Sequence, residues 1–564
     1  MKLACVSLGC DKNLVDSERL LGTLGGEGFT FDDVQGDTGG CVGDGPRRRA
    51  GFTLTDDLGE ADVILVNTCC FIGRAKEESI NALLDAAGWK ERGKCRALVA
   101  AGCLAQRYHA EILEDIPEVD AIVGPHAYGK VSGAIRRALA GEKVVEVAMP
   151  GGSGHIDEHG AGVNGTDRHS TGGHGTDVHS GDGHSSDGHG TGGYSTDVYG
   201  GDGHGSDGHS TGGNGTDGKV AVGPIGGVPG GCAPGKVQVP KRILSTGGHY
   251  AYLKIAEGCD KHCTYCVIPS LRGHYRSAPL EELVEEARTL AAGGVKELIL
   301  VAQETTVYGL DLYGDKRLPA LLRALAAVDG IYWIRLLYCY PEEITDELLD
   351  VMAGEPKICH YLDIPIQHAS DKILKLMGRR TDSESLRRVI RKAREAVPDI
   401  CLRTTLISGF PSETEEDHQA SMGFVREMRF DRLGVFAYSR EEGTPAAMMP
   451  GQVPERLKQK RRRELMRLQQ GISKEISRGM VGRKLQVFAE GEMDDGRWVG
   501  RTYRDAPEVD GRIVFRVAKD ASATGTLLTS PPHADGEGGD FVWVRVTGAG
   551  AYDLKGEVWD EPTK

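Results

Sequence analysis

Three cysteines on one short segment are the strongest chemical signal in the sequence. Cys259, Cys263 and Cys266 stand four and three residues apart in EGCDKHCTYCVIPSLRG, directly after the apolar run AYLKIAEG. Three thiolates on one loop can hold three irons of a cubane cluster and leave the fourth iron open. The alternatives are a zinc site, which requires a fourth ligand, or three structural cysteines. The spacing favours an iron-sulfur cluster with one reactive vertex.

A second set of three cysteines is spread over the first hundred residues. Cys10, Cys69 and Cys103 each follow a short apolar run, in SLGCDKN, VNTCCFI and AGCLAQRY. If these runs are strands of one parallel sheet, their ends bring the three thiols together and predict a second three-ligand cluster. Cys70 is an ambiguity, because adjacent side chains on an extended segment point in opposite directions and only one of Cys69 and Cys70 can face the cluster. The remaining cysteines are interpreted as core or loop thiols: Cys5, Cys41, Cys95, Cys232, Cys339, Cys359 and Cys401.

The order of apolar runs and helical patterns predicts a multidomain α/β protein. Residues 1–150 alternate short strands with helices, as in an α/β sheet domain, and the Gly-rich stretch 34–51 looks like a loop insertion. Residues 241–450 contain about six strand-helix repeats, which predict a partial (βα) barrel with its chemistry at the C-terminal strand ends. Residues 451–482 are expected to form a basic helical connector, and residues 483–564 a small antiparallel β-barrel.

Residues 151–240 differ in kind from the rest. A five-residue period in His, Tyr and Asn runs from His169 to Asn214 among Gly, Ser, Thr and Asp. Such a stretch cannot bury enough apolar surface to offset its chain entropy, so we predict a disordered linker. Because imidazole and carboxylate recur together, the alternative is a metal-binding tract in a non-catalytic scaffold protein.

Charge and hydropathy limit the classes of protein to which the chain can belong. The formal net charge is −15, but the segment from Gly151 to Lys219 alone holds ten acidic residues against Arg168 and Lys219. The remainder is only mildly acidic, which argues weakly against broad nucleic-acid binding. No stretch reaches the roughly 18 apolar residues of a membrane span, and the first residues lack a secretion-signal pattern. A cytoplasmic protein with reduced cysteines is therefore expected.

The motif C-x3-C-x2-C, with Tyr265 before its last cysteine, resembles the radical S-adenosylmethionine superfamily. The two cysteine triads together resemble the methylthiotransferases of that superfamily. The resemblance implies two [4Fe-4S] clusters, S-adenosylmethionine as cosubstrate, a C-terminal TRAM domain and an electron donor such as flavodoxin or ferredoxin. It also implies that one cosubstrate molecule methylates a sulfur and a second provides the radical that removes hydrogen from the substrate.

Longer phrases resemble the branch of the family that acts on an aspartate of small-subunit ribosomal protein S-twelve. They include SLGCDKNLVDSE, QETTVYGLDLYG, DIPIQHASDKILKLMGRR and TYRDAPEVDG. The alternative is the branch that modifies an adenosine of tRNA. Residues 484–564 hold fifteen Asp and Glu against ten Lys and Arg, which suits a basic protein partner better than RNA. We therefore expect a ribosomal protein as substrate, no sequence-specific nucleic-acid binding and no membrane partner.

The resemblance also implies a cosubstrate pocket. Gln303, Gln367 and Arg403 stand at predicted C-terminal strand ends and, with Tyr265, are similar to family positions around the cosubstrate. No catalytic role is assigned beyond the cluster ligands, and His262 and His368 receive none. The chain departs from the family phrase Phe-Pro-Gly-Glu-Thr by having Ser412 in place of the Gly, at a turn that favours positive φ. Cys70 also stands where a Gly is expected.

Overall fold

The computed structural model describes residues 1–26, 53–148, 242–246, 248–516 and 541–559. All of these belong to one compact unit. The predicted loop insertion at 34–51 and the predicted disordered linker at 151–240 lie outside the described residues. Among the described helices, none is both long and apolar enough to cross a membrane.

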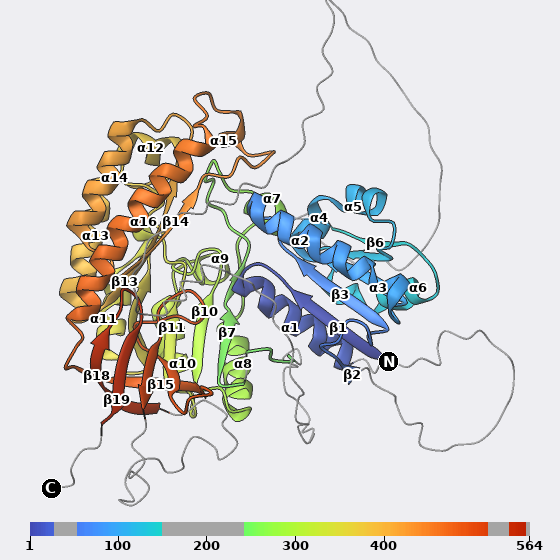
Figure 1. The fold of residues 1–564 in the computed structure, drawn as a ribbon, viewed down its shortest axis with the longest axis horizontal. Helices are drawn as coiled ribbons and strands as arrows, with labels where there is room; N and C mark the ends of the chain where they lie inside the picture. Colours follow the sequence, from blue (N-terminus) through green and yellow to red (C-terminus); the bar gives the residue numbers. More distant parts are fainter. Residues whose placement is uncertain (27–52, 149–241, 247, 517–540, 560–564) are drawn as a thin grey trace, which may run out of the picture. The chain divides into compact units, whose positions relative to one another are not determined.

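The first 148 residues form a parallel sheet flanked by helices. The strand order is β2-β1-β3-β4-β5-β6, and every neighbouring pair is parallel (Figure 1). The central strands are buried on both faces, as expected where helices cover a parallel sheet. The strands are β1 (Lys2–Ser7), β2 (Thr53–Leu54), β3 (Val63–Thr68), β4 (Ala97–Ala101), β5 (Ala121–Val123) and β6 (Val144–Glu146). The helices are α1 (Asp11–Gly26), α2 (Gly73–Ala87), α3 (Trp89–Arg92), α4 (Gly102–Arg107), α5 (His109–Asp115), η2 (Tyr128–Lys130) and α6 (Val131–Leu139).

The middle of the chain forms a second parallel sheet, in the order β14-β13-β12-β11-β10-β7. Helices follow the strands in sequence, so the predicted partial (βα) barrel is confirmed. The strands are β7 (Tyr250–Lys254), β10 (Glu297–Val301), β11 (Trp333–Leu336), β12 (Ile358–Asp363), β13 (Cys401–Ser408) and β14 (Arg432–Ala437). The main helices are α8 (Leu280–Ala292), α10 (Leu318–Ala326), α11 (Asp346–Gly354), α13 (Ser383–Ala396) and α14 (Glu415–Met428). Shorter elements are β8 (Ala256–Glu257), α7 (Ile268–Arg272), β9 (Arg276–Ser277), α9 (Leu310–Tyr313), η3 (Pro341–Glu343), α12 (Asp371–Leu376) and α15 (Pro445–Met448).

A long helix, α16 (Glu455–Arg478), leads to a small C-terminal barrel. Its strands are β15 (Lys484–Glu492), β16 (Trp498–Thr502), β17 (Ile513–Arg516), β18 (Phe541–Ala549) and β19 (Leu554–Val558). The barrel is closed in the order β15-β16-β17-β19-β18, and the pair β17 and β19 is parallel. The predicted small barrel is confirmed, and its strand pairs are antiparallel except for this one. A closed ring with an odd number of strands cannot alternate direction throughout, so one pair must be parallel.

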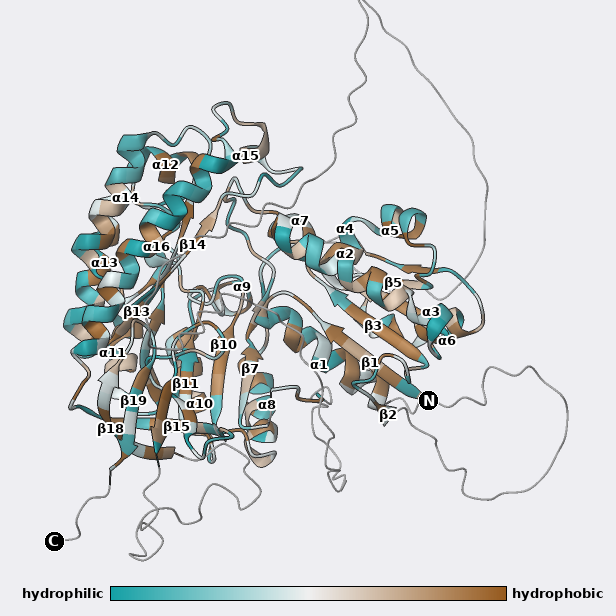
Figure 2. Cartoon of the chain, viewed as in Figure 1, coloured by the Kyte–Doolittle hydropathy of each residue, from teal (hydrophilic) through white to brown (hydrophobic). Residues whose placement is uncertain are grey.

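The apolar residues concentrate on the two parallel sheets, as the hydropathy colouring shows (Figure 2). One buried ionic group also links the (βα) sheet to the C-terminal barrel. Arg335 on β11 donates to Glu297 Oε1 at 2.8 Å, and Arg501 on β16 donates to Glu297 Oε2 at 2.7 Å. All three side chains are almost fully buried. Because each carboxylate oxygen accepts a charge-assisted hydrogen bond, the buried charges compensate one another, and the group fixes the register between the two domains.

Candidate active site

The three cysteines of the C-x3-C-x2-C motif lie on one loop between β8 and α7. The loop begins at Gly258, which has a φ of +83° and lies so close to the chain at His274 that an added Cβ would be 2.1 Å from the His274 carbonyl oxygen. The backbone N–H of Cys259 donates to the Gly273 carbonyl at 3.1 Å, which closes the loop at its base. A glycine at this turn therefore allows the loop to fold back on itself and present its three thiols together.

Burial opposes the ionisation of two of these thiols. It raises the pKa of Cys259 to about 11 and that of Cys266 to about 12. The Tyr340 hydroxyl lies 3.6 Å from the Cys263 Sγ. Tyr265 packs its ring edge to face against Phe410, with ring centroids 6.4 Å apart. Because metal ligands are thiolates, a cluster that binds here must displace protons from buried neutral thiols.

Two buried acceptors without hydrogen-bond partners lie just past the C-terminal end of β10. They are Gln303 Oε1 and Glu304 Oε2. Gln303 Nε2 donates to Glu257 at 2.8 Å, which orients the amide, and burial raises the pKa of Glu304 to about 7. Unsatisfied buried acceptors are costly, so this corner of the barrel fits a ligand that brings hydrogen-bond donors, such as the ammonium group of S-adenosylmethionine.

Gln367 and Arg403 are placed differently from one another. Gln367 has a φ of +69° and bridges to β13, where its carbonyl accepts from the backbone N–H of Ile407 at 2.7 Å. Arg403 was predicted at a C-terminal strand end, but this placement is wrong, because it is the third residue of the eight-residue strand β13. The prediction failed because the strand continues through the polar residues TT that follow Arg403.

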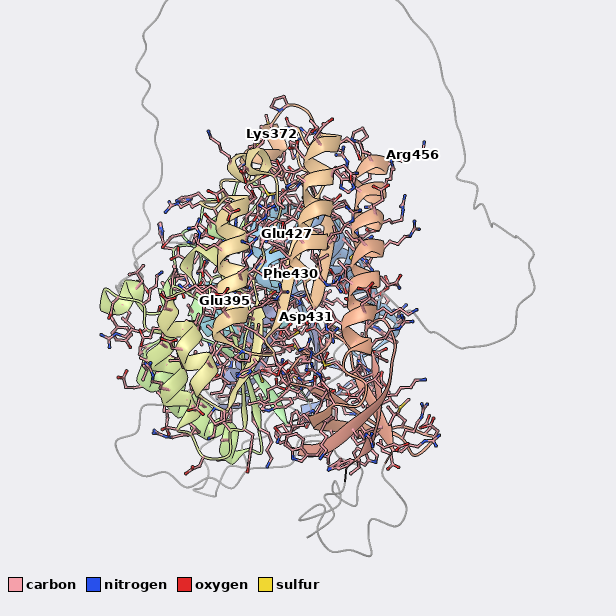
Figure 3. All side chains as sticks on the ribbon, turned by 90° about the vertical axis from the view of Figure 1, so that its left-hand side faces the viewer. Lys372, Glu395, Glu427, Phe430, Asp431 and Arg456 are labelled. Carbon is pink, nitrogen blue, oxygen red and sulfur yellow. The ribbon has the colours of Figure 1, made fainter. Side chains whose placement is uncertain are left out.

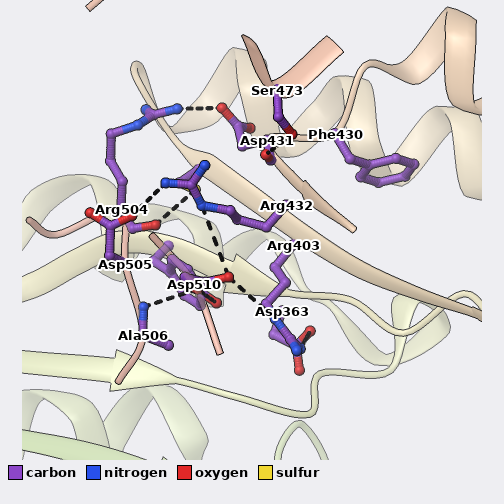
Figure 4. Close-up of polar contacts among 12 residues, drawn as sticks. Asp363, Arg403, Phe430, Asp431, Arg432, Ser473, Arg504, Asp505, Ala506 and Asp510 are labelled. Atoms are coloured by element: carbon purple, nitrogen blue, oxygen red, sulfur yellow. Dashed lines mark hydrogen bonds and ion pairs between the residues drawn. The ribbon is translucent and has the colours of Figure 1, made fainter. Parts of the chain in front are cut away.

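The guanidinium of Arg403 is engaged by acidic groups (Figure 4). It donates to Asp363 Oδ1 at 2.9 Å and lies 3.7 Å from Asp510 Oδ1. Asp510 also accepts from the Tyr361 hydroxyl at 2.6 Å and from the backbone N–H of Ala506 at 2.9 Å. Arg403 thereby ties the (βα) sheet to the segment that follows β16.

The second cysteine triad comes together at the ends of β1, β3 and β4. Cys10 precedes α1, Cys69 follows β3 and Cys103 is the second residue of α4. Burial raises the pKa of Cys69 well above its ordinary value, and the proximity of Cys10 and Cys103 adds to this effect. Gly9, with a φ of +92°, lies against Cys69, and an added Cβ there would be 2.7 Å from the Cys69 Sγ. The triad therefore shares one small volume, which fits a cluster held by three thiolates.

Cys69 and Cys70 have distinct surroundings. Cys70 lies in the apolar core, and its thiol interacts with Arg107 and Cys103. Burial raises the pKa of Cys70 to about 12. Cys69 is therefore the better candidate for the ligand, since it is the thiol influenced by both Cys10 and Cys103. Among the residues that the structure describes, no three His, Cys, Asp or Glu side chains surround a single metal-ion position.

Arg272 connects the two cysteine triads, and the sequence did not single it out. It ends α7, six residues after Cys266, and its side chain is buried. Its Nε donates to Cys103 Sγ at 3.2 Å, and its Nη1 donates to Asp16 at 2.6 Å. Burial raises the pKa of Cys103, while the Arg272 guanidinium opposes that effect. One side chain from the first cysteine loop thus sets the charge environment at the second triad.

Tyr338 is a second residue that sequence reasoning missed. It follows β11 with a φ of +62°, and its hydroxyl donates to both carboxylate oxygens of Asp11, at 2.9 and 3.1 Å. The Lys12 ammonium lies 3.2 Å from the centre of its ring. Asp11 and Lys12 directly follow Cys10, so Tyr338 holds the start of α1 against the open end of the barrel. A non-glycine residue at positive φ is a structural signal, and nothing in the local sequence reveals it.

Comparison with protein families agrees with this architecture. Residues 253–425 match the radical SAM superfamily and residues 481–558 match the TRAM domain. Residues 46–124, which contain Cys69 and Cys103, match uncharacterized protein family UPF0004. The fold and the first cysteine loop therefore define a radical S-adenosylmethionine enzyme, a class that uses a [4Fe-4S] cluster and S-adenosylmethionine.

Full-length relatives narrow the assignment. The chain is 47% identical to ribosomal protein uS12 methylthiotransferase RimO of Lachnoclostridium phytofermentans, over 99% of each chain. It is 41% identical to the protein of the same name from Desulforudis audaxviator, over 99% of this chain and 97% of the relative. The chain belongs to the ribosomal protein uS12 methylthiotransferase family. Among solved structures, the cobalamin-dependent radical enzyme OxsB matches with a TM-score of 0.42 and 12% identity, over 84% of this chain and 56% of that chain.

Proposed function

We propose that the enzyme adds a methylthio group to the β-carbon of an aspartate of uS12, ribosomal protein S-twelve of the small subunit, and consumes two S-adenosylmethionine molecules per turnover. The observation that carries the proposal is the pair of cysteine triads connected by Arg272. In the proposed enzyme, one [4Fe-4S] cluster is held by Cys259, Cys263 and Cys266, and a second by Cys10, Cys69 and Cys103. Neither the tRNA branch nor a non-catalytic scaffold is favoured by the full-length relatives.

Two bound clusters and the cosubstrate would supply the radical that removes hydrogen from an unactivated C–H bond, and the sulfur that replaces it. The residues of the chain have other tasks. Gln303 and Glu304 offer acceptors without hydrogen-bond partners to the cosubstrate, with Lys261 3.9 Å from Glu304 Oε2, and Glu257 orients Gln303. Tyr265 is part of the cluster loop and packs against Phe410, and Gln367 and Arg403 are proposed to line the outer part of the same pocket. Burial of Cys69, Cys103, Cys259 and Cys263 limits the access of water, which would otherwise quench a radical, whereas Cys10 is exposed.

The substrate must reach both triads, so the protein partner is proposed to enter where α1, Tyr338 and the segment after β16 meet. Electrons are proposed to come from a small carrier such as flavodoxin or ferredoxin. A cytoplasmic location follows from the ribosomal substrate and from the reduced thiols that cluster assembly requires. No sequence-specific nucleic-acid contact is needed for this reaction.

The adjacent cysteines provide a matched test. Anaerobically reconstituted wild type is expected to hold about eight irons, twice the load of one four-iron cluster, and to add a methylthio mass to one aspartate of uS12. The Cys69→Ala variant should hold about four irons and lose methylthio transfer to uS12. The Cys70→Ala variant should keep the iron content and the transfer activity of wild type. Equal iron content in the two variants would refute the second cluster site. Modification of tRNA without modification of uS12 would refute the substrate.

A further inference from the structure

The exposed face of α16 carries a row of cations that the active site does not use. Figure 3 shows α13, α14 and α16 side by side on this face of the molecule, with Arg456 near one end of α16. Six exposed basic residues of this helix form what is called here the basic stripe: Arg456, Lys460, Arg463, Arg467, Lys474 and Arg478.

The spacing of these residues places them on one line. Successive members are separated by four, three, four, seven and four positions. At 3.6 residues per turn, all six fall within an arc of about 60°. The stripe runs for about 33 Å along the helix, from a rise of 1.5 Å per residue. The opposite face of α16 is the buried one, with Leu465, Gln469 and Ile472 against the (βα) barrel.

The other charges of α16 are used by the fold. Buried Lys458 donates to the Tyr438 carbonyl at 2.9 Å, and buried Arg461 pairs with Glu413 at 3.1 Å. Of the acidic residues of the helix, Glu464 binds His418 at 2.9 Å and Glu475 binds Arg429 at 2.7 Å. The acids therefore lie at the flanks of the stripe and interact with other elements.

The stripe itself is nearly uncompensated. Within the described part of the chain, the single carboxylate within 4 Å of any stripe cation is that of Glu464, 3.8 Å from Lys460. Like charges three and four residues apart repel one another on a helix, so this arrangement is unfavourable without an anionic partner. It also stands out on a chain whose formal net charge is −15. The stripe fits a polyanion.

The kind of polyanion follows from what accompanies the charges. No large apolar side chain of α16 is exposed. Protein interfaces generally have an apolar or aromatic centre and are depleted in Lys, which argues against an acidic protein partner. Four of the six cations are Arg, whose planar fork matches phosphate oxygens. We propose that the basic stripe binds the phosphate backbone of double-helical RNA. Resting on the proposed function, this RNA is the ribosomal RNA that surrounds uS12 in the small subunit.

A salt titration tests the proposal. The probe is a fluorescently labelled 20-base-pair RNA duplex, and binding is measured by anisotropy between about 50 and 200 mM KCl. The stripe variant combines Arg463→Gln, Arg467→Gln and Lys474→Gln. The control combines Lys94→Gln, Arg288→Gln and Lys555→Gln, three exposed cations elsewhere with the same total charge change. Circular dichroism and iron content confirm that both variants fold and carry clusters.

The expected result is a smaller salt dependence in the stripe variant alone. Losing three phosphate contacts makes the slope of log K against log salt less steep by about 2.7. Over this fourfold salt range, the loss of RNA affinity is therefore about 40-fold smaller in the stripe variant than in wild type. Transfer to free uS12 should be unchanged, while kcat/KM on intact small subunits should fall. Equal slopes in wild type and both variants would overturn the proposal. So would a stripe variant that keeps its RNA affinity and instead loses binding to reduced flavodoxin, a representative acidic protein. Because duplex binding needs no turnover, failure of the methylthio transfer itself would be seen separately.

Discussion

Replacing Arg272 by glutamine removes a buried guanidinium that makes four hydrogen bonds, one of them to Cys103 of the second cysteine triad. Its Nε donates to Cys103, its Nη1 donates to Asp16 and Glu257, and its Nη2 donates to Asn13 at 3.1 Å. Glutamine is shorter and uncharged, so it cannot replace this set of contacts. The control is Arg388→Gln, which removes an exposed guanidinium from α13.

The size of the effect follows from the charges left behind. Without Arg272, Lys254 would have to compensate two carboxylates, that of Glu257 and that of Asp16, which is 3% exposed. Removing one member of a buried ionic group destabilises a protein by about 3–5 kcal/mol. For a domain of this size, such a loss lowers Tm by roughly 6–20 °C. Arg388→Gln should change Tm by no more than about 1–2 °C, the effect of an ordinary surface substitution.

A second readout separates electrostatics from stability. Hydrogen bonds to cluster sulfurs and nearby positive charge raise the reduction potential of an iron-sulfur cluster. Redox titration followed by electron paramagnetic resonance should therefore find a lower potential in Arg272→Gln for the second cluster, which we propose is held by Cys10, Cys69 and Cys103. Arg272→Lys retains the charge without the fork and should give an intermediate potential. An unchanged potential in a folded Arg272→Gln protein with full iron content would refute the role given to this residue.

Three further predictions concern the turn at Ser412, the carboxyl of Glu304 and the thiols of the cluster loop. Ser412 has a φ of +65°, so Ser412→Gly should raise the free energy of unfolding by about 0.5–1 kcal/mol in denaturant titrations, and a loss of stability would contradict the strain argument. The pKa of Glu304 is raised to about 7, so its contribution to stability is complete below about pH 4.5 and is lost as pH rises through 7. Cluster-free Glu304→Gln should therefore gain up to about 3 kcal/mol over wild type near pH 8 and nothing near pH 4, and a constant difference across pH would count against this reading. Because burial holds Cys259 and Cys266 protonated at neutral pH, cluster reconstitution should release protons and proceed faster at about pH 9 than at about pH 7, as followed by calorimetry in two buffers and by absorbance.

Local spacing accounts for what the sequence predicted well. The three cysteines of the first loop lie within eight residues, so the chain itself must bring them close, whatever the rest of the fold does. The alternation of strands and helices was enough to predict the partial (βα) barrel, because each unit has its own periodicity. The replacement of a family Gly by Ser412 correctly pointed to a turn with positive φ, since that requirement is also local.

Contacts between distant residues were decided by the tertiary structure alone. Arg272 and Cys103 are 169 positions apart, and Tyr338 and Asp11 are 327 positions apart. No period or spacing encodes such pairs, because they depend on how packed elements place their side chains. Arg403 shows the same limit, because its contacts with Asp363 and Asp510 depend on its position within β13, which the sequence did not predict. The sequence by itself determined which groups could perform radical chemistry, and packing decided which side chains hold those groups in place.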